Sequence, residues 1–397
     1  MLNHGSADGL RTLVLADLHL TRHTPKAVAE DLVRLVEAHR GTRIVFAGDL
    51  FDLSAESAHV SRDHGIEEGL RRYPAVARAF SEHVDKSGEL WLVSGNHDRE
   101  VGGGAADLAS ALQLTGDARA RVKTTPWFFR LGALHVEHGH LYDPDNAPAH
   151  PLASAPTSLG VHFVEQFIAP TGAFAYLNVN DGTPLKLFLS SFSWYGRRAP
   201  YVIYRFFYSA LTALFSSGPF FKDERARARL ADERMKTFAA DQGVALDVAR
   251  GVLAGRARPT LDSMAHTFAR LYLDRVFSTL GIGAGAAALA LGRQVEGGAM
   301  LSMGVAMMAA SWAIGHDRYA GTVAERLERG ARSVADEAGA RLVVFGHTHR
   351  EATFERYANT GSFAFPRGAP GRPFLEIEGA LDRPRALRRY WTSDAPR

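Results

Sequence analysis

Near its C-terminal end the chain reads Val343-Val344-Phe345-Gly346-His347-Thr348-His349-Arg350. An apolar run ends at a glycine, and two histidines follow, two residues apart. A buried strand that ends here would bring both imidazoles to the edge of a sheet, because glycine lets the backbone turn tightly. Neutral imidazole is the commonest protein ligand of borderline metals. The stretch therefore predicts part of a metal site, whose other ligands should follow other strands.

Polar clusters also follow the other apolar runs of the chain. Runs over 12–16, 43–47, 90–94 and 133–136 each end in such a cluster, and helical spacing over 25–39 and 66–86 separates the first three. The clusters are Asp17-x-His19, Gly48-Asp49, Gly95-Asn96-His97-Asp98 and His138-Gly139-His140. Strands that alternate with helices predict an α/β layered fold, and such sheets bind ligands at the carboxyl ends of their strands.

The clusters supply oxygen and imidazole ligands, and the 397 residues contain no cysteine. This excludes disulfides, thiolate metal sites and cysteine nucleophiles. The ligands suit manganese, iron or zinc better than copper(I), and the histidines argue against a pure magnesium or calcium site. They are too many for one ion, so we expect two ions about 3.5–4 Å apart that share one carboxylate. Such a pair lowers the pKa of a bound water and neutralises charge on a phosphoryl oxygen. His135 and His140 could take part in the site or could instead be packing or capping residues.

The pattern changes between residues 144 and 339. Strand signals nearly vanish there, and helix-length segments follow one another. We therefore predict a catalytic domain in two parts, 1–143 and 340–397, interrupted by a helical insertion over 144–339 that acts as a lid or in membrane association. After His349 the pattern again predicts strands, over 352–357, 374–377 and 386–391.

The order of the clusters, D-x-H, GD, GNHD, H and GHTH, resembles the calcineurin-like metallophosphoesterase superfamily. That resemblance implies a β-sandwich flanked by helices, here with a large, mainly α-helical insertion. It also implies two divalent metal ions, with manganese as the first expectation and iron or zinc as alternatives. One ion would be held by Asp17, His19, the bridging Asp49 and His349. The other would be held by Asp49, Asn96, His138 and His347.

The same resemblance implies roles for two residues that do not bind metal. His97 would contact the phosphate and help to protonate the leaving oxygen, and Asp98 would orient His97. In local spelling, Ala16-Asp17-Leu18-His19-Leu20 and Gly48-Asp49-Leu50-Phe51 are similar to the UDP-2,3-diacylglucosamine pyrophosphohydrolases. Those enzymes act on a lipid A precursor at the membrane, have arginine at the position of His97, and carry a shorter helical lid.

Two features of the insertion suggest contact with a membrane. Eight of the seventeen residues in 192–208 are aromatic and three more are arginine, a mixture typical of a membrane interface, although a packed lid or a surface that stacks single-stranded nucleic acid has similar composition. Two uncharged runs, 276–292 and 297–315, would form a hairpin whose helices are short for spanning a bilayer. We expect this hairpin to lie shallowly in the interface, with burial in the protein or in a dimer interface as the alternative.

Together these features predict a metal-dependent hydrolase of phosphoric esters or pyrophosphates, which acts on a lipid-linked substrate at the membrane surface. The alternatives are a phosphatase or phosphodiesterase of a soluble, nucleotide-type substrate, and a non-catalytic, membrane-bound interaction protein. The formal charge of +3 gives no reason to expect nucleic acid as a partner. The N-terminus has no signal-peptide pattern, so we expect a cytoplasmic protein on the cytoplasmic face of the membrane.

Overall fold

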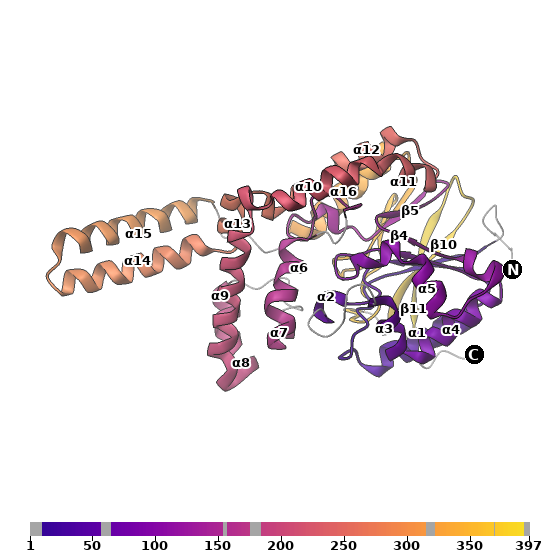
Figure 1. Ribbon diagram of the computed structural model, residues 1–397, viewed down its shortest axis with the longest axis horizontal. Coiled ribbons are helices and arrows are strands. Elements are labelled where there is room, and N and C mark those ends of the chain that lie inside the picture. The colour runs from indigo at the N-terminus through magenta and orange to yellow at the C-terminus, as the bar shows by residue number, and fades with distance from the viewer. Residues whose placement is uncertain are drawn as a thin grey trace.

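The computed structural model describes residues 10–56, 65–153, 157–174, 184–314, 322–368 and 370–392. Two β-sheets face each other, and helices cover their outer faces (Figure 1). The predicted α/β fold class is confirmed, with a β-sandwich flanked by helices and a large, mainly helical insertion. The N-terminal segment 1–9 and residue 315 of the predicted hairpin lie outside the described residues.

The first sheet has six strands in the order β11-β10-β1-β2-β3-β4. Its strands are β1 Thr12–Leu15, β2 Arg43–Ala47, β3 Glu89–Val93, β4 Val122–Thr125, β10 Arg372–Glu378 and β11 Arg385–Trp391. The strands β1 to β4 are parallel, and β10 pairs with β1 in the antiparallel direction. Continuous apolar runs form β1 and β2 because both faces of these strands are buried.

The second sheet has five strands in the order β5-β6-β7-β9-β8. Its strands are β5 Phe128–Leu131, β6 Leu134–Glu137, β7 Leu342–Phe345, β8 Ala352–Thr353 and β9 Tyr357–Asn359. Strands β5 and β6 form an antiparallel pair. Strand β6 lies parallel to β7 with Leu134 opposite Leu342, so the two parts of the chain join within one sheet.

Apolar side chains fill three layers. The middle layer lies between the sheets and joins residues such as Val45 and Val344. One outer layer lies beneath α1 Lys26–Ala38, α3 Gly65–Arg72, α4 Pro74–Asp85 and α5 Ala105–Ala111. The other lies beneath α11 Met235–Asp241, α12 Leu246–Ala254 and α16 Thr322–Glu337. These layers hold the strand ends in fixed positions.

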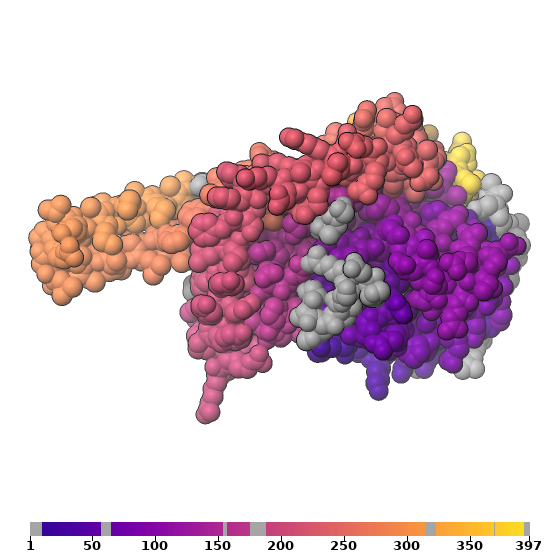
Figure 2. All heavy atoms as spheres, viewed as in Figure 1, coloured from indigo at the N-terminus to yellow at the C-terminus, as the bar shows by residue number. Residues whose placement is uncertain are grey.

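The described residues between 144 and 339 form helices and no strand. Besides α11, α12 and α16, the α-helices described there are α6 Leu159–Phe163, α7 Ala169–Thr171, α8 Pro184–Tyr195, α9 Ala199–Phe215, α10 Lys222–Glu233, α13 Met264–Arg270, α14 Leu273–Ala290 and α15 Gln294–Ile314. A π-helical turn, η5 Val164–Ile168, joins α6 to α7. Helices α14 and α15 form a hairpin that projects from the rest of the molecule as an arm (Figures 1 and 2).

The hairpin is held together by close approach of its two helices. A Cβ atom at Gly285 would overlap the backbone of Leu301, and one at Gly304 would overlap the backbone of Ile282. Small residues such as Gly281, Gly285 and Gly304 allow this packing. Within the described part of the chain, no helix is both long enough and apolar enough to cross a membrane.

Three predicted elements differ in detail from the structure. The helix predicted over 66–86 is broken, because α3 ends at Arg72 and α4 starts at Pro74, whose ring removes a helical hydrogen bond. Among the helix-length segments predicted between 144 and 339, the one over 260–280 is interrupted at Tyr272, whose φ is 54°. The strand predicted over 352–357 is two short antiparallel strands, β8 and β9.

Candidate metal centre

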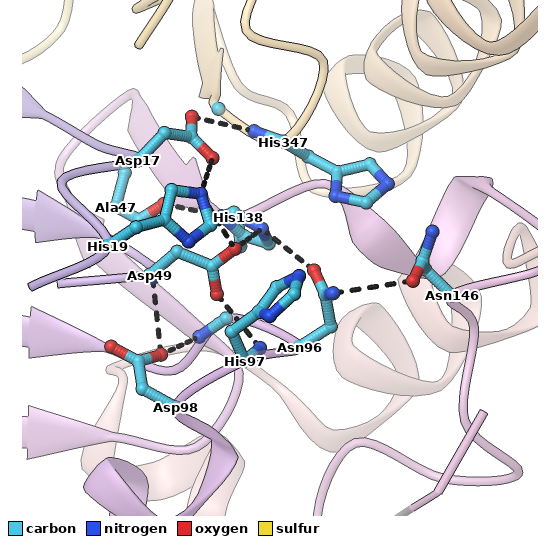
Figure 3. A network of polar contacts seen from close by, with 12 residues as sticks. Asp17, His19, Ala47, Asp49, Asn96, His97, Asp98, His138, Asn146 and His347 are labelled. Atoms are coloured by element: carbon cyan, nitrogen blue, oxygen red, sulfur yellow. Dashed lines mark hydrogen bonds and ion pairs between the residues drawn. The ribbon is translucent and has the colours of Figure 1, made fainter. Parts of the chain in front are cut away.

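Every predicted site residue lies just beyond the carboxyl end of a strand. The residues Asp17 and His19 follow β1, Asp49 follows β2, Asn96, His97 and Asp98 follow β3, His138 follows β6, and His347 and His349 follow β7. Because these strands run in the same direction within each sheet, their ends meet at one edge. The structure thus brings together residues that lie more than 300 positions apart in the chain (Figure 3).

The backbone is strained at this edge. Eight non-glycine residues in the described chain have positive φ, and five of them are predicted metal ligands. These five are Asp17, His19, Asp49, His347 and His349, with φ between 46° and 68°. Left-handed conformations are costly for such residues and tend to occur where function demands a particular side-chain direction.

Glycines make room for the polar side chains. Gly48 has a φ of 87°, and a Cβ atom there would overlap the His138 ring. A Cβ atom at Gly95 would overlap the carboxylate of Asp49. The glycines of the GD and GNHD clusters are therefore required by close packing at the site, and at Gly48 also by the backbone conformation.

A first group of ligand atoms surrounds His138. Its Nδ1 atom lies 2.9 Å from the carbonyl oxygen of Ala47, to which it donates a hydrogen bond. Its Nε2 atom lies 3.2 Å from Oδ2 of Asp49 and 3.1 Å from Oδ1 of Asn96. In a neutral ring, Nε2 is then an acceptor that faces two further acceptors. Three acceptors that converge in this way fit a cation between them.

A second group lies beside the first and contains Asp17, His19 and His349. The Nε2 atoms of the two histidines are 3.1 Å apart, and that of His349 is 3.3 Å from Oδ1 of Asp17. This carboxylate oxygen is buried and accepts no hydrogen bond. A buried carboxylate oxygen without a donor is costly unless a cation is nearby. The second group therefore also fits a metal ion.

Three overlapping sets of side chains lie close enough to hold a metal ion. They are Asp17, His19 and His349; His19, Asp49 and His97; and Asp17, Asp49 and His138. Asp17, His19 and Asp49 each belong to two of the sets, as expected where two ions lie close together. Bound divalent ions would lower the pKa of a water molecule and neutralise charge on a phosphoryl oxygen.

His347 lies next to these sets but belongs to none of them. Its ring centroid is 5.2 Å from that of His138, and its Nε2 atom lies 3.0 Å from Oδ2 of Asp143. A metal ligand from this ring would therefore be Nδ1. Asp143 also accepts a hydrogen bond from Asn146 (2.7 Å), and Asn96 donates one to Asn146 (3.3 Å). Asp143 and Asn146 thus orient two predicted ligands, and our sequence analysis did not identify them.

The predicted role of Asp98 is wrong. Its carboxylate accepts hydrogen bonds from the backbone N–H groups of Asp49, Phe51 and Gly95, so it holds the loops in place rather than orienting His97. The partner of His97 is Asp52, whose Oδ1 lies 2.9 Å from Nδ1 of His97. Sequence analysis missed Asp52, although it stands only three residues after Asp49 in the stretch Gly48-Asp49-Leu50-Phe51-Asp52.

The pKa values of His97 and Asp98 are both shifted by their surroundings. Burial disfavours the charged ring of His97, but the carboxylates of Asp52 and Asp49 outweigh burial and raise its pKa to about 10. Burial and the neighbouring Asp49 carboxylate raise the pKa of Asp98 to about 7. His97 is therefore held in the protonated form, which is the form that can donate a proton to a leaving oxygen.

His135 and His140, for which packing or capping roles were also considered, lie in different positions. His140 is buried 5.4 Å from the His138 ring, and burial together with the charges of His138 and His347 holds its pKa well below the usual range. His135 points into the core and packs against Phe128, with 4.6 Å between ring centroids. His135 therefore has a packing position, whereas His140 stands as a neutral ring beside the ligands.

A cavity of about 500 Å³ opens onto the predicted ligands. One side is polar and includes His19, Asp49, His97 and His349. The opposite side is apolar and comes from α6, η5 and the residues after α7, namely Phe163, Val164, Ile168 and Phe174. The insertion therefore forms one wall of the site.

The family model for calcineurin-like phosphoesterases matches residues 10–202. Over these residues the chain is similar to the calcineurin-like phosphoesterases. No curated protein matches the chain. The match contains the clusters from Asp17 to His138 and ends before β7, so the structure adds His347 and His349 to the calcineurin-like site. It also includes α6, η5 and Phe174, which supply apolar residues to the cavity wall.

Proposed function

We propose that this protein is a metal-dependent phosphoesterase that hydrolyses a phosphodiester or pyrophosphate bond in a lipid-linked substrate at the membrane surface. The cavity is the observation that carries this proposal. Its polar side would receive the phosphate, and its apolar side would contact the hydrocarbon part of the substrate. A lipid-linked phosphate has both of these parts and would therefore contact both the polar and the apolar residues of the cavity.

The chain's own residues have separate tasks in this reaction. Asp17, His19, Asp49, Asn96, His138, His347 and His349 would hold two divalent ions, with manganese as the first expectation. His97 would donate a proton to the leaving oxygen from Nε2, because Nδ1 is engaged by Asp52. Asp52 would keep the ring in this orientation and stabilise its charge.

Membrane association is supported by an exposed stripe on α9. Five apolar and aromatic side chains are 37–65% exposed along one face of this helix, namely Tyr201, Tyr204, Tyr208, Leu211 and Phe215. Their spacing of three and four residues places them on one side. The opposite side of α9 packs on the cavity wall, where Phe206 lies 5.4 Å from Phe163 between ring centroids.

The α14–α15 hairpin offers a second apolar surface. Leu280, Leu291, Val295 and Met303 are 62–83% exposed, and the hairpin tip has an ion pair between Arg293 and Glu296. Shallow burial in the interface would cover these side chains and leave the tip pair among the head groups. In this arrangement the protein works at the cytoplasmic face of the membrane.

Two measurements test the proposal. Hydrolysis of bis(p-nitrophenyl) phosphate with added manganese tests the reaction class, and a protein loaded with metal that shows no turnover would favour the non-catalytic interaction protein. Extraction of lipids from the purified protein, followed by mass spectrometry, tests the substrate class. Turnover of nucleotide diesters without any preference for vesicle-borne phosphates would instead favour the soluble substrate.

A paired substitution tests the membrane surface. Changing both Tyr204 and Phe215 to serine should lower binding to lipid vesicles, and should lower turnover of a vesicle-borne phosphodiester relative to the soluble aryl diester. The matched control is Leu230→Ser on α10, which is 61% exposed but lies away from the stripe. Equal vesicle binding by wild type and the double variant would remove α9 from the proposal.

A further inference from the structure

A second cavity, of about 640 Å³, lies behind the metal centre, between α16, α13 and the segment around Pro144. Four arginines line it: Arg258, Arg270, Arg326 and Arg329. Asp145 is the acidic residue in its lining. Positive charge therefore exceeds negative charge around this space, and arginines that share a cavity repel one another unless an anion lies between them.

Arg326 and Arg329 are the least satisfied of the four. They occupy the face of α16 that also carries Gly330 and Ser333 to the cavity, because positions three, four and seven apart share one side of a helix. Neither guanidinium has a hydrogen bond or ion pair with any residue in the described part of the chain. By contrast, Arg332, which lies outside the cavity lining, is paired with Glu328.

The other two arginines are each held in place by a carboxylate. Nε of Arg270 lies 2.6 Å from Oδ2 of Asp145, and Nε of Arg258 lies 2.7 Å from Oδ2 of Asp262. These pairs fix the directions of the two guanidinium groups at the cavity. Arg258 also borders a neighbouring cavity of about 420 Å³ that contains Arg225, Arg229 and Arg256, so the basic surface continues.

We propose that this arginine cavity is a second site, separate from the metal centre, for a ligand that carries at least two phosphate charges. Guanidinium groups bind phosphate oxygens through paired hydrogen bonds, and several of them favour a multiply charged group over a single carboxylate. The cavity volume is large enough for an organic diphosphate. The source is either a soluble diphosphate or an anionic lipid head group, since α13 leads directly into α14 of the exposed hairpin (Figure 1). The proposal goes beyond the proposed hydrolysis and does not depend on it.

The segment 143–146 connects the two sites. Asp143 contacts His347 on the side of the metal centre, and Asp145 contacts Arg270 on the side of the arginine cavity. The backbone between them is fixed because Thr260 donates from its N–H to the carbonyl oxygen of Pro144, at 2.8 Å. A ligand on Arg270 would thus lie against the segment that orients His347.

Titration calorimetry with methylenediphosphonate, a diphosphate that cannot be hydrolysed at its P–C–P bridge, tests the soluble source. We expect two binding events on the full chain with metal. In the double variant Arg326→Ser/Arg329→Ser, the affinity of one binding event should fall at least tenfold. In Asp49→Ala the other binding event should be lost. Replacement of both arginines by lysine should weaken the event without abolishing it, because lysine keeps the charge and loses the paired geometry.

The matched control is Arg332→Ser on the same helix, with circular dichroism spectra to show that all variants are folded. Vesicles of phosphatidylcholine with and without cardiolipin, whose head group carries two phosphates, test the lipid source. Loss of the cardiolipin-dependent part of vesicle binding in the double serine variant alone would assign the cavity to a lipid head group. If the double serine variant matches Arg332→Ser with both probes, the proposed site is overturned, whatever the outcome for hydrolysis.

Discussion

Nδ1 of His97 lies 2.9 Å from Oδ1 of Asp52, so the ring that faces the cavity is held by a carboxylate from the loop that follows β2. The same loop carries Asp49, whose Oδ1 accepts a hydrogen bond of 3.0 Å from the N–H of His97. One short segment therefore positions both a proposed metal bridge and the proposed proton donor.

Asp52→Asn should lower kcat by about 10–100-fold while both metal ions remain, because loss of an orienting partner typically has an effect of this size. The Asp52 carboxylate raises the pKa of His97, so its removal lowers that pKa. The limb of the pH–rate profile that reports loss of the acid should therefore move to lower pH. An unchanged profile would argue against the pairing, and Asp85→Asn, at an exposed position, is the control.

His97→Ala should keep both metals and the fold while kcat falls by about 10²–10⁴-fold, the usual contribution of a positioned general acid. Combined with Asp52→Asn, the loss should be smaller than the product of the two single losses, since the two residues act as a pair. Metal analysis by mass spectrometry separates this role from ligation. A fall in metal content that parallels the fall in activity would make His97 a ligand.

Asp49→Ala should abolish hydrolysis and release metal, because Oδ2 of Asp49 lies between the two groups of ligands, 3.2 Å from Nε2 of His138 and 3.8 Å from Nε2 of His19. The measurement is the metal content of the purified variant by plasma mass spectrometry, with Asp52→Asn as the comparison that retains its ions. Two ions still bound to Asp49→Ala would show that this carboxylate is not shared between them.

The strand ends and their polar clusters were predictable because each signal is local. An apolar run, a glycine and a metal-ligating side chain stand next to one another in the chain, and the direction of parallel strands brings them to one edge. Asp52 and Asp143 were not found, since a carboxylate that orients a histidine has no local pattern of its own. Their closeness in the sequence to Asp49 and His140, respectively, was the signal by which they could have been found.

The helical part was predicted only in outline. Helical periodicity does not show where two helices meet, so the break at Tyr272 and the apolar wall around Phe163 depend on packing between distant segments. The cluster of arginines around the second cavity is of the same kind. Arg258 and Arg326 are far apart in the chain, and they line one cavity because α16 packs against α12, which precedes Arg258.

Gly48→Ala should lower metal affinity and activity, because a Cβ atom would overlap His138 at a position where φ is 87°. The expected loss in metal affinity is tenfold or more, measured by competition with a chelator. Gly103→Ala is a matched control, since its Cβ atom would have no neighbour within 4 Å. Equal metal affinity in the two variants would contradict the close packing of Gly48 against His138.

Folding stability should fall as the pH drops from 6.5 towards 4, in part because of His150. Burial, together with the charge of Arg256, lowers the pKa of this histidine from 6.5 to about 4. In this interval the unfolded chain binds the proton and the folded chain does not, so acid favours unfolding. His150→Phe should reduce the difference in unfolding free energy between pH 7 and pH 4.5 by about 1–2 kcal/mol, as measured by urea denaturation. An unchanged difference would show that His150 titrates normally.

The sheets are assembled from segments that leave the ribosome at very different times. Strand β1 has its antiparallel neighbour β10 from the end of the chain, and β6 waits for β7 until the whole helical insertion has been made. Until then both strands present unpaired backbone groups along one side, which is the arrangement that invites association between nascent chains. Slow synthesis across the insertion would lengthen this exposure, so we expect the yield of native protein to depend on translation rate and on chaperones that bind open sheet edges.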